Sequence, residues 1–533
     1  MNSPLKSLCV RWGAAGRLWS TSLTWLFGLA ATQTIGAAEK PNIIFIMSDD
    51  HAAHAISAYG SRINRTPHLD RLAREGLRFN RCFAVNSICT PSRATILTGK
   101  YSHKNGVPVF NPLDGSQHTV AKILQANGYH TLMIGKWHLG SDPTGFDHWE
   151  ILPGQGRYVN PVLYDRDGAR SYNGYVTDVV TDLALGALEK RPTDKPFFLM
   201  LHHKAPHREW TPNARYREEF SRRKIPEPKT LRDNYATRTD ALREQKQSVF
   251  HDLTRFDLKL PPPPELKGAE RNQWVGVKPT EVEIEIDGHK KVLKGSELND
   301  WKYQRYMQDY LGCVQSVDDN VGRVLDWVDS HQLRENTLII YTSDQGFFLG
   351  DHGMYDKRFM YEESIRMPFL VRWPAGIAKR GTNDRLINNC DFAPTFLQVA
   401  GVPIPSDIQG RSLLPLFAGE KPSDWRTSLY YRYYHDPGHH DTRAHLGVRT
   451  DRYKLIHFWK KDQWECFDLK KDPYELKNIY SQPKAQPVVA QLKSELARLK
   501  QTLGDNDEFA EVQPSGGVDG PPKKWKPGFG PNP

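Results

Sequence analysis

Two short apolar runs, each ending in a serine and then an aspartate, constrain the fold of this chain most strongly. The first is Pro41 to Ser48, followed by Asp49-Asp50, and the second is Thr337 to Ser343, followed by Asp344-Gln345. Continuously apolar runs of this length are typical of central parallel strands covered on both faces. Because functional side chains of open α/β sheets gather beyond the carboxyl ends of strands, these oxygen-bearing residues are predicted to meet at one edge.

The adjacent carboxylates of Asp49 and Asp50 raise an electrostatic problem. An aspartate after a strand is often a helix cap in a turn, but two adjacent carboxylates repel each other and call for a positive neighbour. With Asp344 and Gln345 they offer only oxygen ligands, which select Ca²⁺ or Mg²⁺ over zinc. Several carboxylates in flexible geometry favour Ca²⁺ over Mg²⁺.

Two further strands are predicted to deliver polar residues to the same edge. The run Tyr129 to Ile134 leads to Lys136 and His138, and Pro196 to Leu201 leads to the stretch from His202 to His207. The three histidines of that stretch do not have the spacing of a helical zinc site. Helical periodicity is present at Thr66–Gly76, Val120–Asn127, Val176–Leu188, Tyr306–Val328 and Val488–Leu503.

Cys89 begins a segment with helix signals at both ends. Thr90, Pro91 and Ser92 favour a helix start, and Gly99 favours a stop. Helix N-termini attract anions, and Arg93 lies one turn in, where its guanidinium can reach the same point. The alternative for such a pair is a buried structural cysteine beside a surface arginine.

The stretch from Cys89 to Lys100 resembles the C-x-P-S-R…L-T-G signature of the type I sulfatases, in the alkaline-phosphatase-like superfamily. Gly128 to Gly140 resembles the second signature of that family, and the likeness covers roughly residues 40–480. It implies an α/β fold, with a large mixed sheet flanked by helices and a smaller C-terminal antiparallel-sheet subdomain with a helix. It also implies that Cys89 is converted to formylglycine by a formylglycine-generating or anaerobic sulfatase-maturating enzyme.

The resemblance assigns roles to residues of this chain. It implies a divalent cation held by Asp49, Asp50, the modified Cys89, Asp344 and Gln345, where the family often has Asn at the last position. It further implies that Arg93, Lys136 and Lys357 stabilise the charge of the sulfate group, and that His207 or His138 protonates the leaving alcohol. His203 is the second choice for the histidine beside the leaving group.

Within the family, the chain is most similar to N-acetylglucosamine-6-sulfatase-like bacterial glycan sulfatases. This likeness rests on His203 to Arg208 and on Tyr430 to Asp468. It implies 6-O-sulfo-N-acetylglucosamine in mucin-like or glycosaminoglycan-like chains as substrate. The residues expected to contact the sugar are His203, Asp351, His352, Arg443 and His445, together with His439 and His440.

Two other functions remain open from the sequence. One is a phosphodiesterase or phosphonate monoesterase of the same superfamily, since some of those enzymes also use formylglycine. The other is a non-catalytic sulfoglycan-binding protein with an unmodified Cys89. A binder has no need of both Cys89 and Lys136, which favours an enzyme.

The chain divides by composition into several parts. Residues 1–38 have basic residues, an apolar run and small residues, as in a signal peptide; the alternative is an uncleaved anchor. Residues 40–424 form the predicted catalytic domain, in which the charged, proline-rich segment 208–300 is an irregular insertion that serves as a lid or substrate wall. Residues 425–503 form the C-terminal subdomain, and 504–533 are predicted to be a disordered tail.

Charge and cysteine content limit the possible partners and compartments. The formal charge is +10, but the basic residues are interleaved with acids, so nucleic acid is not an expected partner. The positive charge is consistent with an anionic substrate. The five cysteines after the leader are widely spaced, unlike a disulfide framework or a zinc site. With no other apolar stretch of membrane length, the protein is predicted to be periplasmic or secreted.

Overall fold

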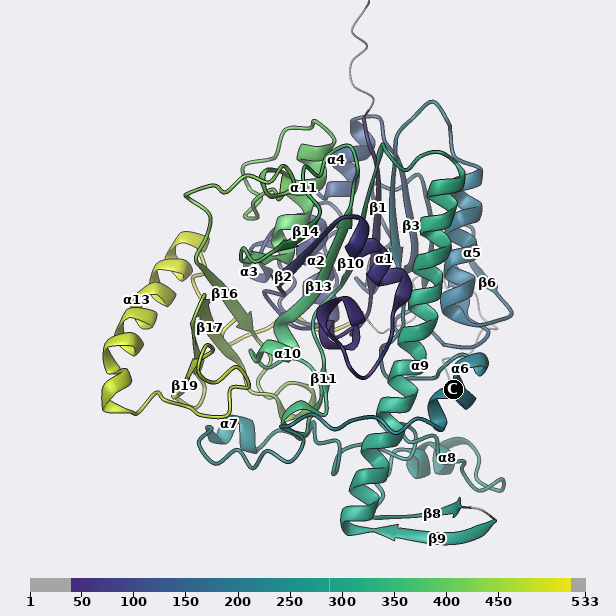
Figure 1. The fold of residues 1–533 in the computed structure, drawn as a ribbon, viewed down its shortest axis with the longest axis vertical. Helices are drawn as coiled ribbons and strands as arrows, with labels where there is room; N and C mark the ends of the chain where they lie inside the picture. Colours follow the sequence, from purple (N-terminus) through teal and green to yellow (C-terminus); the bar gives the residue numbers. More distant parts are fainter. Residues whose placement is uncertain (1–39, 287, 519–533) are drawn as a thin grey trace, which may run out of the picture. The chain divides into compact units, whose positions relative to one another are not determined.

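The computed structural model of the chain describes residues 40–286 and 288–518. The predicted signal peptide and residues 519–533 lie outside them. Within this part of the chain, a large mixed sheet forms the centre of the fold (Figure 1). Its strands are β1 (Asn42–Ser48), β2 (Leu77–Phe83), β3 (His130–Lys136), β4 (His148–Leu152), β5 (Val162–Tyr164), β6 (Ala169–Ser171), β7 (Phe197–His202), β10 (Thr337–Ser343), β13 (Arg366–Arg372), β14 (Gly381–Asn383) and β15 (Ile387–Asn388).

The strand order puts the two apolar runs side by side. The path is β14-β2-β13-β10-β1-β7-β3-β4-β5-β6, and β10, β1, β7, β3 and β4 run parallel. Ser48 of β1 pairs with Ser343 of β10, so the aspartates that follow these strands leave the sheet together. The predicted central parallel strands and the mixed sheet are confirmed.

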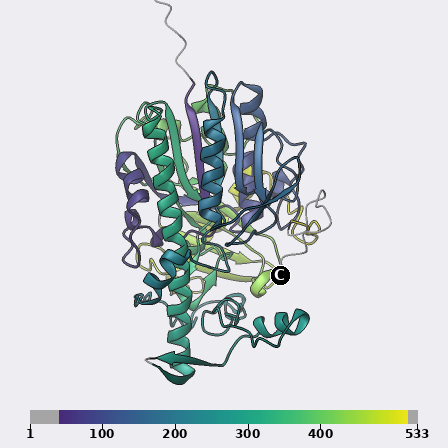
Figure 2. The ribbon, with the colours of Figure 1, turned by 90° about the vertical axis from the view of Figure 1, so that its right-hand side faces the viewer.

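Helices cover both faces of the sheet because β1 alternates its apolar side chains. Ile44 and Ile46 belong to one core with α1 (Pro67–Glu75), α5 (Val176–Glu189) and α9 (Gly295–Ser330). Phe45 and Met47 belong to a second core with α2 (Cys89–Thr98), α4 (Val120–Ala126) and α11 (Phe392–Val399). Figure 2 shows α5 and α9 lying along the sheet. The remaining short helices of the larger domain are α3 (Ser102–Asn105), α10 (Glu362–Ile365) and α12 (Leu414–Phe417).

The segment 208–300 is more regular than the sequence suggested. It contains α6 (Ala214–Ser221), α7 (Asp240–Arg243), α8 (Gly268–Val275) and a hairpin of β8 (Glu281–Ile286) and β9 (His289–Lys294). The helix expected at Tyr306–Val328 begins eleven residues earlier, at Gly295. The hairpin leads directly into it, and Leu293 packs with Leu298 and Trp301 in a small core of its own.

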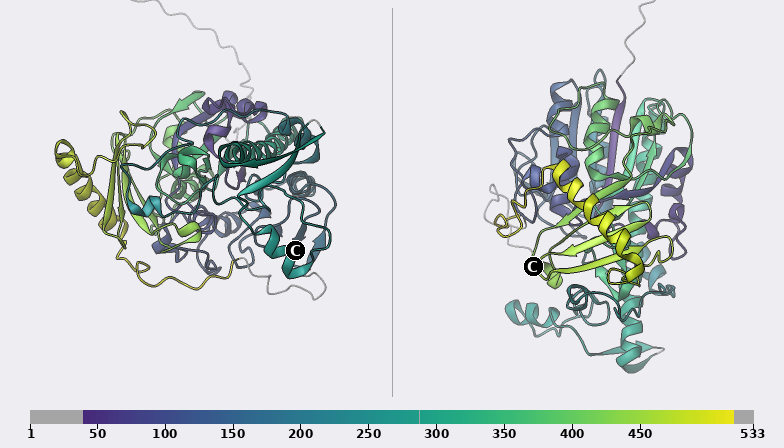
Figure 3. Two further views of the ribbon diagram at one scale, coloured as in Figure 1. Left: turned by 90° about the horizontal axis from the view of Figure 1, so that it is seen from below. Right: turned by 90° about the vertical axis from the view of Figure 1, so that its left-hand side faces the viewer.

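A four-stranded antiparallel sheet forms the C-terminal part of the fold. Its strands, in order, are β16 (Ser428–Tyr433), β17 (His445–Thr450), β18 (Tyr453–Phe458) and β19 (Gln463–Asp468). Helix α13 (Gln486–Leu503) packs on one face through Val489, Leu492 and Leu496 (Figure 3). The other face packs on Phe359 and Tyr361 of the larger domain, so this sheet supports the loop that follows β12 (Tyr355–Asp356).

The first part of the predicted tail has a defined place in the fold, and the rest lies outside the described residues. Residues 504–518 are described, and Asp505 is 4 % exposed. Its carboxylate accepts hydrogen bonds from the Tyr430 hydroxyl and the Arg432 guanidinium, each at 2.7 Å. Because a buried carboxylate needs such partners, this pairing fixes the start of the tail on β16. Among the described helices, none has the length and apolar content needed to cross a bilayer.

Candidate active site

Three carboxylates meet at the edge where β1 and β10 end. Oxygen atoms of Asp49, Asp50 and Asp344 lie within 4.8 Å of one another, and all three side chains are fully buried. Asp50 adopts a positive φ of 65°, which turns its side chain back toward this edge, and its backbone N–H donates to Asp344 at 3.2 Å. The aspartates that follow the two apolar runs therefore lie together at one edge of the sheet, as predicted.

The carboxylates of the cluster repel one another, although each lies beside a buried cation. The pKa of Asp50 is raised to about 6. Burial is the main cause, the charge of Asp344 adds to it, and the charge of Lys357 partly counters it. The Gln345 amide nitrogen donates to Asp50 at 2.5 Å, while the amide oxygen is buried without a hydrogen-bond partner. An orphaned oxygen beside three carboxylates fits a hard divalent cation, which would also relieve the repulsion.

Cys89 faces this cluster from the first residue of α2. Its Sγ lies 3.4 Å from Asp49 Oδ1, and the side chain is 1 % exposed. Burial raises the pKa of the thiol to about 12, so an unmodified Cys89 is almost entirely protonated at neutral pH and is a weak nucleophile. Arg93, one turn on, lies 3.0 Å from Asp344 and donates to the Lys136 carbonyl at 2.6 Å.

Lys136 and His138 follow β3 as predicted. Lys136 donates to Asp49 and to the Gln155 side-chain oxygen. Gln155 also lies 3.1 Å from His138 Nε2, so one amide positions both residues. Thr90 of α2 donates to the His138 carbonyl at 3.0 Å, which ties the β3 end to the Cys89 helix.

His207 is the histidine of its stretch that points to the carboxylates. Its Nε2 lies 3.8 Å from Asp50, and its Nδ1 donates to the Arg208 carbonyl, so Nε2 is the nitrogen left for a ligand. Burial lowers the pKa of His207, and the charges of Lys136, Lys357 and Lys204 lower it further. The bound anion of a substrate would offset those cations and raise that pKa.

Lys204 is a fourth cation that the sequence analysis did not assign to the site. It is 2 % exposed and lies 4.7 Å from the Tyr158 ring. Burial lowers its pKa to about 8, partly countered by Glu209, Cys313, Asp50 and Cys89. Lys204, which follows the end of β7, therefore places a further positive charge near Asp50 and Cys89.

The loop after β12 brings Lys357 and a neighbour that sequence reasoning missed. Lys357 Nζ lies 2.7 Å from Asp50; burial favours its neutral form, but Asp50, Cys89 and Asp356 together outweigh burial and raise the pKa of Lys357. Arg358 Nε donates to Asp356 at 2.7 Å, while one of its terminal nitrogens is buried without a partner. Arg358 has a positive φ of 87°, which aims its side chain away from the strand direction.

A histidine-bearing segment of the C-terminal part lies beside Arg358. His440 lies 3.9 Å from Asp356, and His439 stacks on Phe110 at 5.2 Å between ring centroids. Phe110 also lies 6.1 Å from the His138 ring, which connects this segment to the loop after β3. We call Asp356 to Arg358 together with residues 434–445 the rim.

The other expected sugar contacts have partners within the protein. Asp351 accepts from His54 at 3.0 Å, and the fully buried His352 lies 2.9 Å from Asp233. His445 has both ring nitrogens engaged, with the Met360 N–H at 3.1 Å and the Arg443 carbonyl at 2.8 Å. These hydrogen bonds tie the three side chains to neighbouring segments of the protein, and their assignment to the sugar stays a prediction.

Arg443 and His203 complete the set of expected contacts. Arg443 is partly exposed and lies 3.4 Å from Glu244 and 3.7 Å from Asp436. His203 is fully buried, neither of its ring nitrogens has a hydrogen-bond partner, and burial lowers its pKa to about 3. Burial holds both rings neutral, so position decides between them: His207 Nε2 lies 3.8 Å from Asp50, which favours His207 over His203.

Two models of known families match the chain. The sulfatase model matches residues 41–402, and the model for the C-terminal part of N-sulphoglucosamine sulphohydrolase matches residues 350–502. The first covers the large sheet with its strand-end residues, and the second begins just before the Lys357 loop and runs through the C-terminal sheet.

Relatives of known function are similar over most of their length. The chain is 45% identical over 515 residues to an N-acetylglucosamine-6-O-sulfatase of Bacteroides thetaiotaomicron, which covers 92% of each chain. It is 28% identical to the human N-acetylglucosamine-6-sulfatase, over 76% of this chain and 69% of that protein.

Solved structures agree with the fold. One in complex with its substrate, D-glucosamine-2-N,6-O-disulfate, has a TM-score of 0.82 and 43% identity, and covers 89% of this chain and all of the other. The phosphonate monoester hydrolase of Agrobacterium radiobacter has a TM-score of 0.68 at 21% identity, covering 87% of this chain and 96% of that one, a likeness of fold alone. With the matched model over the large sheet and the strand-end cluster around Cys89, the chain belongs to the sulfatase family.

Proposed function

We propose that this sulfatase removes the 6-O-sulfate from N-acetylglucosamine residues of sulfated glycans. The observation that carries the proposal is the cluster of Asp49, Asp50, Cys89 and Asp344, with four buried cations around it and a histidine at its open side. The 45% identity to an N-acetylglucosamine-6-O-sulfatase, and the structural likeness to a complex with a 6-O-sulfated glucosamine, support the choice of sugar.

The family uses formylglycine and a divalent metal, and the residues of this chain fit both. Asp49, Asp50, Asp344 and Gln345 would hold the ion, and Ca²⁺ suits this all-oxygen set best. When present, the ion polarises a sulfate oxygen, and the hydrated formylglycine at position 89 supplies the attacking hydroxyl. The 1 % exposure of Cys89 restricts access at this point to a small group such as a sulfate.

The cations stabilise the charge that is redistributed during sulfate transfer. Arg93, Lys136 and Lys357 are each held by a carboxylate of the cluster, so their positions are fixed before the substrate binds. Such preorganised charges in a dry site are the largest expected contribution to catalysis. A sugar hydroxyl is a poor leaving group, and His207 Nε2 is the atom placed to give it a proton.

The rim is the candidate for sugar recognition. Arg358 has a buried nitrogen without a partner, which a hydroxyl or carbonyl of the sugar would satisfy. His440 and Asp356 stand beside it, and Phe110 offers a ring face to a sugar ring. Of the contacts expected from the sequence, Arg443 lies on this segment, while Asp351, His352 and His445 are bonded elsewhere.

Maturation and location complete the proposal. Cys89 requires a formylglycine-generating or anaerobic sulfatase-maturating enzyme as a transient partner. The basic, apolar and small residues of 1–38 support export to the periplasm or beyond. We further propose 40–424 and 425–503 as the limits of the catalytic part and the C-terminal subdomain.

The test is sulfate release by the matured enzyme. N-acetylglucosamine-6-sulfate is compared with its 3-sulfated isomer, with 6-sulfated galactose and with a phosphate diester, and the Cys89→Ala variant serves as the blank. The proposal expects the first substrate to have the highest kcat/KM. Faster turnover of the phosphate diester would point to the phosphodiesterase alternative, and faster turnover of 6-sulfated galactose would overturn the sugar assignment.

A further inference from the structure

A cavity of about 660 Å³ lies at the β14 edge of the large sheet, and no residue assigned to the reaction lines it. Its wall comes from β2, from residues 379–386, from residues 416–427 and from Asp451 in the turn between β17 and β18. Segments that are far apart in the sequence therefore meet here, and the volume is within the usual range of ligand sites, roughly 300–1,000 Å³.

Most of the cations in this cavity lack an acidic partner. Lys379, Arg380 and Lys421 are exposed and Arg385 is half-buried, and none of them forms an ion pair with a described residue. Only two cations of the wall are neutralised: Arg81 by Asp451 at 2.8 Å, and Arg426 by Asp391. Against the four unpaired cations stand Asp384 and Glu420, so positive charge remains in excess.

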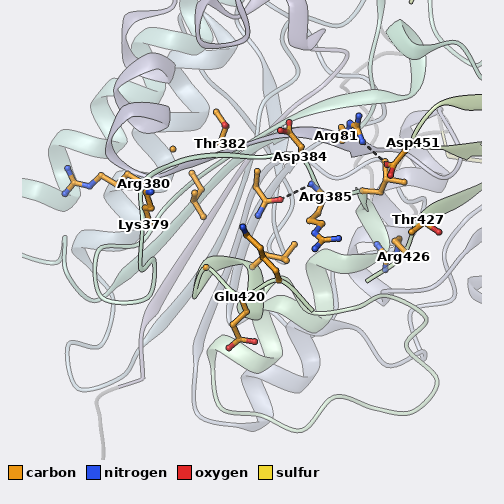
Figure 4. A pocket seen from close by; sticks show the side chains of 17 residues that line it. Arg81, Lys379, Arg380, Thr382, Asp384, Arg385, Glu420, Arg426, Thr427 and Asp451 are labelled. Atoms are coloured by element: carbon orange, nitrogen blue, oxygen red, sulfur yellow. Dashed lines mark hydrogen bonds and ion pairs between the residues drawn. The ribbon is translucent and has the colours of Figure 1, made fainter. Parts of the chain in front are cut away.

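The cations are spread along the cavity instead of meeting at one point. In the view of Figure 4, Lys379 and Arg380 lie at one end, while Arg385 lies nearer Arg81 and Arg426 at the other. A small anion contacts only one such end. An extended chain that carries several anionic groups can contact both.

A second cavity provides an internal comparison. It has a similar volume, about 640 Å³, and shares Arg81 and Asp451 with the first. Its charges are closer to balance: Arg449 lies 3.2 Å from Glu362 and Arg452 lies 2.7 Å from Asp468, while Arg366 and Lys470 form no ion pair with a described residue. Six lysines and arginines and three acids line the β14 cavity, whereas five and four line the second, so a larger excess of positive charge distinguishes the β14 cavity.

The β14 cavity is also separate from the reaction site by topology. Leu77 and Gly381, which pair at its wall, stand at the start of β2 and of β14. Strand β2 runs in the same direction as β10 and β1, because β13 is antiparallel to both β2 and β10. The start of β2 is thus at the end of the sheet opposite to Asp49 and Asp344.

We propose that the β14 cavity is a second binding site for the sulfated glycan chain, which holds sulfate groups distant from the one being hydrolysed. This rests on the proposed function only in the choice of a sulfated carbohydrate as ligand. Arg380, Arg385 and Lys421 provide the charge, and the arrangement needs a polymer long enough to extend beyond the reaction site. Such a site raises the local concentration of chain ends without changing the chemistry.

The test measures binding and hydrolysis separately. Binding of the full chain to immobilised heparin is measured by surface plasmon resonance in the Cys89→Ala background, with N-acetylglucosamine-6-sulfate present to fill the reaction site. The triple variant Arg380→Ser, Arg385→Ser and Lys421→Ser is expected to bind about tenfold more weakly, since each exposed charge contact contributes modestly. A matched control removes three exposed charges elsewhere, with Lys190→Ser, Lys195→Ser and Arg271→Ser.

The outcomes separate the second site from simple charge attraction and from the reaction itself. A loss confined to the β14 triple variant, with sulfate release from the monosaccharide unchanged in the otherwise wild-type chain, supports the site. Equal losses in both triple variants, no loss in either, or equal binding to unsulfated hyaluronan would overturn it. Because binding is read without turnover, failure of the proposed hydrolysis leaves this result interpretable.

Discussion

The floor and the rim of the reaction site are built from different kinds of structure. We use floor for Asp49, Asp50, Cys89, Arg93 and Asp344, which follow strands or begin a helix and are at most 2 % exposed. The rim is loop except where Asp356 ends β12 and His445 begins β17, and its Arg358 and His440 have positive φ angles. On the proposed function, residues fixed by the sheet carry out sulfate transfer, and the rim selects the sugar.

The largest expected effect is on the floor, and it does not depend on the sugar. Replacing Cys89 by Ala removes the precursor of the nucleophile, so kcat is expected to fall by at least about 10³-fold on sugar sulfates and on 4-nitrophenyl sulfate alike. Cys466→Ala removes a buried thiol from the C-terminal sheet and is the matched control. Residual activity of Cys89→Ala above about one per cent of wild type would contradict the assignment.

Metal removal tests the floor as a whole. Chelation is expected to abolish activity and to lower Tm by about 5 °C, because the ion binds only the folded carboxylate cluster. Differential scanning fluorimetry with Ca²⁺ and Mg²⁺ added back separates the two ions, and Ca²⁺ is expected to restore Tm at the lower concentration. An unchanged Tm and activity after chelation would show that Asp49, Asp50 and Asp344 hold no ion.

The leaving group tests whether His207 is the acid. His207→Gln is expected to lower kcat/KM by about 10²- to 10⁴-fold on N-acetylglucosamine-6-sulfate. The effect on 4-nitrophenyl sulfate should be small, because nitrophenolate leaves without protonation. His203→Gln is the control, and an equal loss on both substrates would indicate a structural role for His207.

A rim substitution sharpens the comparison, because it should affect only the sugar substrate. Arg358→Ala is expected to lower kcat/KM for the sugar sulfate by about 10- to 100-fold, the usual cost of a lost charged hydrogen bond. Hydrolysis of 4-nitrophenyl sulfate should change little. Arg443→Ala, which lies on the rim with acidic partners of its own, should have a smaller effect; a loss on both substrates would place Arg358 with the floor.

The smallest expected effect concerns stability rather than chemistry. Burial alone lowers the pKa of His352, but Asp233 and Glu363 outweigh it and raise the pKa to about 10. The stabilising charge is therefore fully present below the unfolded pKa of about 6.5 and is lost as pH rises toward 10. The difference in unfolding free energy between wild type and His352→Gln, measured by urea denaturation, should shrink over that range. A constant difference would mean that His352 does not titrate there.

Sequence reasoning recovered the floor because its signals are local. The apolar runs before Asp49 and Asp344 identify buried strands, and the carboxyl ends of parallel strands share an edge. Strand β13 gave no such signal, because Pro368 interrupts its pattern at the point where the register shifts.

The rim and the loop that carries Gln155 could not be predicted in the same way. Gln155 lies in a glycine-rich loop, and Arg358 takes its direction from a positive φ, so neither has a periodic pattern around it. The sequence predicted that His352 and His445 contact the sugar. A sequence does not show whether a histidine binds a sugar or a neighbouring loop. The fold supplies the partners that the sequence does not show: Asp233 of the segment 208–300 for His352, and the Met360 N–H for His445.

Mass spectrometry of the peptide that carries Cys89, from protein purified from its own host and active on sulfate esters, tests the central claim most directly. That claim is that the floor is the chemical part of a sulfatase and that Cys89 is its reactive position. The account predicts an aldehyde or its hydrate at position 89, with Cys82, Cys313, Cys390 and Cys466 unmodified. An unmodified Cys89 thiol throughout the active protein would contradict it.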